Sequence, residues 1–199
     1  MSLLEILTAL LIVGVLAALV IPIVGKIQAT ARNTECISNL RQVGLAMNTY
    51  AAENGGRYPH AYAPPGDQKT WMWKLAPYVG LRDDVMGPAP KPRSVGIFVC
   101  PEWKKQSEQS TNSRNLSYGI SRYIDPDTRP AANRYWNYQP NRVSSKTILV
   151  AEIDVNNEFA YAEKIERRHP HESANYLFVD GHVENLREII NGNDPRWYQ

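Results

Sequence analysis

The feature that most constrains this chain is an apolar run near its N-terminus. The nineteen residues from Ile6 to Val24 carry no charge. As an α-helix they would measure roughly 28 Å, close to the thickness of the hydrocarbon core of a bilayer. Glu5 lies at the edge of this run, where an unpaired carboxylate inside a membrane costs a few kcal/mol. The run therefore predicts a membrane-spanning helix in which one charged residue needs a specific partner.

Three interpretations of this segment differ in how they account for Glu5. A signal peptide has a basic region before its apolar core, but the first basic side chain here is Lys26, after the core. A simple membrane anchor explains the length and the cationic residues Lys26 and Arg32, but it gives Glu5 no role. A helix that leaves the bilayer and packs against copies of itself lets Glu5 pair with the free α-amino group of Met1 on a neighbouring subunit. The third interpretation accounts for every unusual residue.

The order of residues in the segment carries further information. It has a hydrophobic residue 1, a small residue 2, Leu3-Leu4-Glu5 and a long apolar stretch that contains Gly14 and Pro22. This pattern resembles the mature N-terminus of type IV pilins and type II secretion pseudopilins. The resemblance implies that a prepilin peptidase cleaves before Met1, that Met1 is the N-methylated first residue of the mature chain, and that Glu5 sets subunit registry.

Helical spacing continues beyond the membrane segment. Between residues 26 and 53, apolar or small residues recur at steps of three and four, at Ile37, Leu40, Gly44, Met47 and Ala51. Asn54-Gly55-Gly56 ends the pattern, so we expect one helix of roughly fifty residues. Gly14 and Pro22 are expected either to kink it or to melt locally in an assembled filament. The chain then divides into a transmembrane or filament-core helix (1–25), its amphipathic continuation (26–54) and a globular head (55–199).

The head is predicted to be a small antiparallel β-sheet with long loops. Fourteen prolines and twelve glycines favour such loops. Apolar or alternating stretches predict strands at residues 95–100, 116–121, 146–152 and 158–163. A short helix is expected at residues 70–79, and its tryptophans, Trp71 and Trp73, are expected to belong to the core. The fold class is therefore α+β and, given the resemblance, type IV pilin-like, with the long helix packed on the sheet.

The last part of the head reads as a β-hairpin. Asp180-Gly181 separates two apolar runs, 175–179 and 182–186, and predicts a tight turn in which both central residues have positive φ. Together with the histidines upstream, this hairpin resembles the H-x9-D-G domain at the C-terminus of many prepilin-like proteins. Ten residues separate His169 from Asp180 and eight separate His171 from Asp180, so neither histidine has the family's spacing. Residues 36–42, 100–101 and 117–119 also resemble that group.

The chain contains two cysteines, Cys36 and Cys100. In an exported protein an even count predicts a disulfide, whereas two lone cysteines make a poor zinc site. The bridge would close a loop of about 65 residues and join the helix to the head. Two buried free thiols are the alternative.

Other residues are candidate metal ligands. His169, His171, Asp180 and His182 have suitable side chains and would converge if the loop before the hairpin folds over it. Alternatively, Asp180 shapes the turn and the histidines bind backbone groups. Calcium is a separate candidate, because some pseudopilins similar to this chain bind it in a C-terminal loop. The segments 125–127 and 154–158 offer oxygen ligands without an EF-hand pattern. We expect no other cofactor.

Charge and motifs narrow the function. A formal net charge of +2 argues against nucleic acid as a partner. Because nucleotide-binding and hydrolase motifs are absent from the sequence, we expect no enzymatic activity.

The pilin resemblance implies a homopolymeric filament subunit. Such a chain is held in the bacterial inner membrane until prepilin peptidase processes it and a pilus or secretion machinery assembles it. It ends in a cell-surface or extracellular filament, or in a periplasmic one if it is a pseudopilin. The alternative function is a membrane-anchored binding module whose head loops bind a ligand or a surface polysaccharide.

Overall fold

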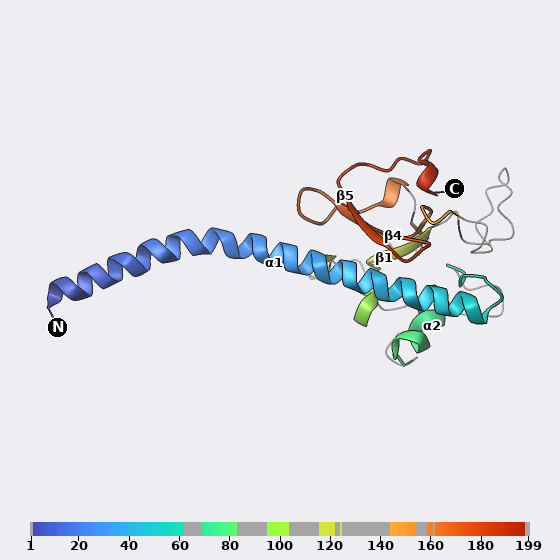
Figure 1. The fold of residues 1–199 in the computed structure, drawn as a ribbon, viewed down its shortest axis with the longest axis horizontal. Coiled ribbons are helices and arrows are strands. Elements are labelled where there is room, and N and C mark those ends of the chain that lie inside the picture. Colours follow the sequence, from blue (N-terminus) through green and yellow to red (C-terminus); the bar gives the residue numbers. More distant parts are fainter. Residues whose placement is uncertain are drawn as a thin grey trace.

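One helix, α1, runs from Leu3 to Glu53 and gives the molecule its elongated shape (Figure 1). The structure is a computed structural model. It describes residues 2–61, 69–82, 95–103, 116–121, 124, 144–153, 159–160 and 162–197. The prediction of a single long helix packed on a small sheet is confirmed.

Local sequence sets both ends of α1. At the start, the Ser2 side chain accepts a hydrogen bond from the Leu4 amide, and the Ser2 amide donates to the Glu5 carboxylate, a reciprocal capping box. At the other end, Gly55 and Gly56 have φ values of 65° and 78°, which glycine adopts without steric cost. The helix continues through Gly14 and curves gently, as Figure 1 shows. Melting of this region in a filament stays a prediction.

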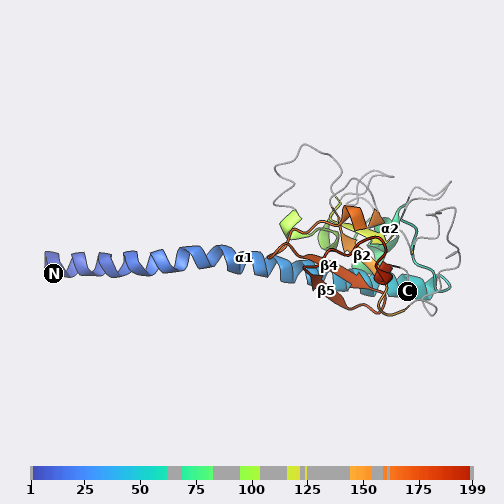
Figure 2. The same ribbon diagram turned by 90° about the horizontal axis from the view of Figure 1, so that it is seen from above.

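The two halves of α1 lie in different environments. The N-terminal half extends away from the head in both views (Figures 1 and 2), and its side chains are exposed. The C-terminal half buries the predicted apolar stripe, including Leu40, Met47 and Ala51. It contacts β4 (Ala174–Phe178) and β5 (Val183–Leu186) on one side. On the other side it contacts the short helical segments α2 (Trp71–Leu75), η1 (Ala76–Val79) and η3 (Gly96–Phe98).

The sheet has five strands in the order β3-β1-β2-β4-β5. β1 (Tyr118–Ser121), β2 (Ile148–Glu152), β4 and β5 are antiparallel neighbours, whereas the two-residue β3 (Phe159–Ala160) pairs with β1 in parallel. Every residue of β1, β2 and β4 is buried, which is why these strands read as nearly continuous apolar runs rather than as alternating ones. The predicted small antiparallel sheet is confirmed, with one short parallel strand at its edge.

Three local predictions need correction. Of the strand expected at 158–163, the structure describes only Phe159–Ala160 as a strand, and Ala162–Lys164 is a turn of 3-10 helix. Residues 95–100 were expected to form a strand, but Gly96–Phe98 is a turn of 3-10 helix, because Gly96 has a φ of 55° and cannot continue an extended backbone. The hairpin turn spans Phe178–Gly181, with Gly181 donating to the Phe178 carbonyl at 2.9 Å. Gly181 alone has positive φ there (89°), so Asp180 and Gly181 are not the two central residues of a mirror-image turn.

The core lies between the C-terminal half of α1, the sheet and the short helical segments. Trp71 and Trp73 are buried, as predicted, and Trp71 packs edge-to-face on Phe98 with ring centroids 5.7 Å apart. Two further turns of 3-10 helix, Ala162–Lys164 and Pro195–Trp197, complete the described part of the head.

Candidate functional site

The first candidate site is the exposed surface of the N-terminal half of α1. Large apolar side chains are exposed at nearly every position of this half, so they face outward on all sides of the helix. They are Leu3, Leu4, Ile6, Leu7, Leu10, Leu11, Ile12, Val13, Val15, Leu16, Leu19, Val20, Ile21, Ile23, Val24 and Ile27. Such a surface requires an apolar environment, which a membrane or a protein partner provides. Within the described residues, α1 is the one helix long and apolar enough to cross a membrane, a test that a signal sequence also passes.

Glu5 has a partner within its own chain. The Ser2 amide donates to Oε2 of Glu5 at 2.9 Å, and Ser2 Oγ accepts from the Leu4 amide at 3.2 Å. A carboxylate in the first turn also interacts favourably with the positive end of the helix dipole. Because Met1 lies outside the described residues, the pairing of Glu5 with a neighbouring N-terminus stays a prediction.

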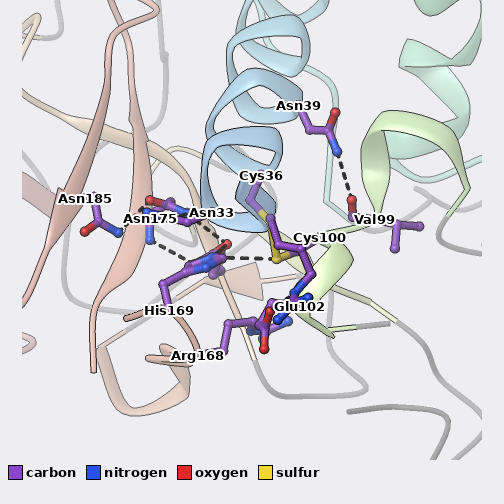
Figure 3. Close-up of a disulfide and its surroundings, with 12 residues drawn as sticks. Asn33, Cys36, Asn39, Val99, Cys100, Glu102, Arg168, His169, Asn175 and Asn185 are labelled. Atoms are coloured by element: carbon purple, nitrogen blue, oxygen red, sulfur yellow. Dashed lines mark hydrogen bonds and ion pairs between the residues drawn. A yellow bond between two sulfur atoms is a disulfide. The ribbon is translucent and has the colours of Figure 1, made fainter. Parts of the chain in front are cut away.

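The second candidate site is the junction between α1 and the head (Figure 3). Cys36 of α1 and Cys100, which follows η3, form the predicted disulfide, with Cα atoms 5.0 Å apart and both residues fully buried. Asn39 Nδ2 donates to the Val99 carbonyl at 3.0 Å one turn further along. On the other side of the bridge, Arg32 pairs with Glu102. The helix is thus fixed to this segment by a covalent bond with polar contacts on either side.

A buried acid and a buried histidine lie against the disulfide. His169 Nε2 is 3.6 Å from Cys100 Sγ and 2.6 Å from Oε1 of Glu152, the last residue of β2. Both the Glu152 and the His169 side chains are completely inaccessible to solvent. Asn175 of β4 supports the acid, since its backbone N–H donates to Glu152 Oε2 at 2.9 Å and its side-chain Nδ2 donates to Oε1 at 3.3 Å.

The same network reaches both α1 and the sheet edge. The Asn175 side chain donates to Asn33 Oδ1 at 2.9 Å and accepts from Asn185 Nδ2 at 2.8 Å, which links α1, β4 and β5. Nearby, burial raises the pKa of Tyr118 well above its usual value, and the negative charge of Glu152 raises it further. Hydrogen-bonded polar groups therefore fill the interior of the junction beside the apolar core.

The structure separates the four predicted metal-ligand residues. His169 precedes β4 and forms an isolated antiparallel β-bridge with Ser173. Asp180 and His182 instead pair with each other at the hairpin turn that follows β4. His182 also stacks on Phe178 with ring centroids 4.3 Å apart. His171 is exposed and has a φ of 64°. The segments 125–127 and 154–158, considered for calcium, lie outside the described residues.

The ligand-type side chains that do converge are Cys36, Cys100, Glu152 and His169, whose ligand atoms all lie within 4.8 Å of one another. Sequence reasoning named both cysteines and His169 but missed Glu152. The sequence did contain a signal for Glu152. Glu152 ends the apolar run of residues 148–152, in which every residue is buried, and an acid in such a strand needs buried partners.

Together these features define a fold class. A long N-terminal helix packed on a small, mainly antiparallel sheet is a pilin-like α+β arrangement, and the apolar half of α1 is the corresponding pilin-like segment. A family model described as a protein of unknown function (DUF1559) matches residues 26–85, which include the packed half of α1, α2 and η1. No curated protein and no solved structure matches the chain.

Proposed function

We propose that this chain is a structural subunit of a helical filament, a pilin or pseudopilin, and not an enzyme. The observation that carries the proposal is the N-terminal half of α1, which is apolar on all sides and extends away from the described part of the head. Burying one such side chain contributes roughly 1.5 to 3 kcal/mol. Lipid covers this surface while the subunit waits in the inner membrane, and neighbouring helices cover it in the filament.

Glu5 has a different partner in each state. In the separate subunit it caps its own helix through the Ser2 amide. In the filament it also neutralises the N-terminus of a neighbour, which sets the axial position of one subunit against the next. A prepilin peptidase generates that N-terminus, and a pilus or secretion machinery extracts the subunit. The filament lies at the cell surface or, for a pseudopilin, in the periplasm.

Two substitutions separate the capping role from the pairing role. Glu5→Gln removes the charge but keeps a side-chain oxygen that accepts the Ser2 amide, since glutamine serves in capping boxes. Ser2→Ala removes the Ser2 side-chain bond to the Leu4 amide but keeps the charge. We expect Glu5→Gln to reduce the filament yield at least tenfold while membrane levels of the chain stay normal, and Ser2→Ala to assemble nearly normally. Normal assembly of Glu5→Gln would refute the pairing role.

The filament itself is tested by imaging sheared extracellular and periplasmic material with an antibody against the head. Filaments that contain the chain along their whole length support the proposal. If the chain stays in the membrane fraction and cross-links only as a monomer, the filament proposal is wrong and the membrane-anchored binding module takes its place.

A further inference from the structure

The junction contains a set of side chains that resembles a closed metal site interrupted by a disulfide. Cys36 Sγ, Cys100 Sγ, Glu152 and His169 come from four separate segments, are all buried, and place one ligand atom each within 4.8 Å of the others. We propose that, when the Cys36–Cys100 bond is reduced, these four residues bind one zinc ion. This inference does not depend on the filament function.

The distances suit tetrahedral zinc. With Zn–S bonds of about 2.3 Å and Zn–N and Zn–O bonds of about 2.0 Å, tetrahedral angles place sulfur roughly 3.5 Å from nitrogen and nitrogen roughly 3.3 Å from oxygen. Cys100 Sγ is already 3.6 Å from His169 Nε2. The Nε2 to Glu152 Oε1 distance of 2.6 Å has to open by about 0.7 Å, and reduction separates the two sulfur atoms. Small side-chain movements therefore create the site.

The surroundings hold the ligands in place. Glu152 ends a fully buried strand, and Asn175 donates to both of its oxygens. Hydrogen bonds of this kind orient a ligand and are typical around metal sites. Four protein ligands leave no open coordination position, which is typical of a structural zinc site. Arg168, the neighbour of His169 in the sequence, donates to the backbone carbonyl of Ile153, next to Glu152, and so brings a positive charge near a site whose net charge would be −1.

The chemistry balances in two steps. A phosphine reductant breaks the S–S bond and is oxidised to the phosphine oxide, with its oxygen from water, and each sulfur gains one proton. Zinc then displaces both thiol protons to solvent. Nε2 of His169 binds the metal in its deprotonated form, and the imidazole proton is carried by Nδ1, an atom without a hydrogen-bond partner in the described part of the chain. The same residues thus close the junction in either redox state.

Cobalt is the probe that tests the site. The full-length chain in detergent micelles is reduced with a phosphine, freed of reductant without oxygen, and titrated with Co²⁺. We expect thiolate-to-cobalt charge-transfer bands and the intense visible bands of tetrahedral coordination at one ion per chain, both abolished by zinc. The oxidised chain is the first control and is expected to give neither. Absence of these bands in the reduced chain would overturn the proposal.

Two variants show that the site uses more than a pair of thiols. His169→Ala and Glu152→Gln are expected to weaken cobalt binding at least about tenfold. His182→Ala, which changes a histidine at the hairpin turn, is expected to leave it unchanged. If His169→Ala binds cobalt as tightly as the natural chain does, the site is only an adventitious pair of thiols and the proposal is wrong.

A measurement on the natural sequence covers the case in which these variants do not fold. Zinc is expected to slow the alkylation of both thiols in the reduced chain at least tenfold and to restore the near-ultraviolet circular dichroism of its buried aromatic residues. An unchanged alkylation rate would contradict the proposal.

Discussion

Removing the disulfide is predicted to destabilise the head by about 4 kcal/mol. Cys36 and Cys100 are 64 positions apart, so the bond closes a loop of about 65 residues in the unfolded chain. The chain-entropy relation gives roughly 14.5 cal/mol/K for such a loop, or about 4.3 kcal/mol at 25 °C. Since domains are typically stable by about 5 to 15 kcal/mol, this single bond accounts for a large share of the total.

Two forms of the protein separate loop entropy from packing. Reduced natural chain keeps both sulfur atoms and loses only the cross-link. The double variant Cys36→Ala/Cys100→Ala also loses the packing of two fully buried sulfurs, so its loss is expected to be larger. Both are compared with the oxidised chain in detergent micelles that contain a metal chelator, which prevents zinc from replacing the cross-link.

Urea unfolding followed by tryptophan fluorescence measures the effect. Trp71, Trp73 and Trp197 are buried in the head, so their emission reports its unfolding and not that of the exposed half of α1. At about 2 kcal/mol per M of urea, the midpoint should fall by roughly 2 M on reduction. A fall of less than about 0.5 M would refute the loop-entropy argument and would mean that the unfolded chain already holds the two segments together.

Two further predictions concern the close contact between helix and sheet and the buried phenol. A Cβ at Gly44 would lie 2.9 Å from Leu177 Cδ1, so Gly44→Ala is expected to destabilise the head by about 1 kcal/mol despite better helix propensity. Gly25→Ala, whose new Cβ has no described atom within 4 Å beyond the neighbouring helix backbone, should increase helicity instead, and urea unfolding with circular dichroism distinguishes the two. Because burial, and then Glu152, raise the pKa of Tyr118, the fold favours its neutral form. That stabilising contribution is complete below about pH 10 and is lost above it at about 1.4 kcal/mol per pH unit. In thermal melts, the melting temperature of Tyr118→Phe should therefore fall less steeply with rising pH than that of the natural chain. Equal slopes would contradict the argument.

The helix was predictable because its determinants are local. Apolar spacing from Leu40 to Ala51 and the glycines after Asn54 act within a few positions of where they stand in the sequence. The central strands were predictable for a similar reason, since 146–152 and 175–179 are dense apolar runs bounded by polar residues. The disulfide followed from cysteine count and expected export, without any knowledge of distance.

The errors lie where the backbone conformation depends on distant contacts. Residues 95–99 have strand-like composition, but Gly96 takes a left-handed φ and packs near Leu81, which no local pattern indicates. At the hairpin, the Asp-Gly pair correctly marked a turn, yet the turn begins at Phe178 and uses only the glycine's positive φ. A pattern of two residues therefore located the turn without defining its type.

Glu152 shows why the junction could not be assembled from the sequence. Its hydrogen-bonding partners are Asn175 on the neighbouring strand and His169 before that strand, and the two sulfur atoms of the disulfide lie within 4.8 Å of it. Its place at the end of an apolar strand predicts that Glu152 is buried, but which group meets it depends on the pairing of β2 with β4, where Val150 lies opposite Leu177 after a register shift. A shift of one residue in that register would turn Asn175 to the other face and leave the buried acid without its donors. The carboxylate therefore penalises incorrect registers, so the junction forms fully only when α1, β2 and β4 are all correctly placed.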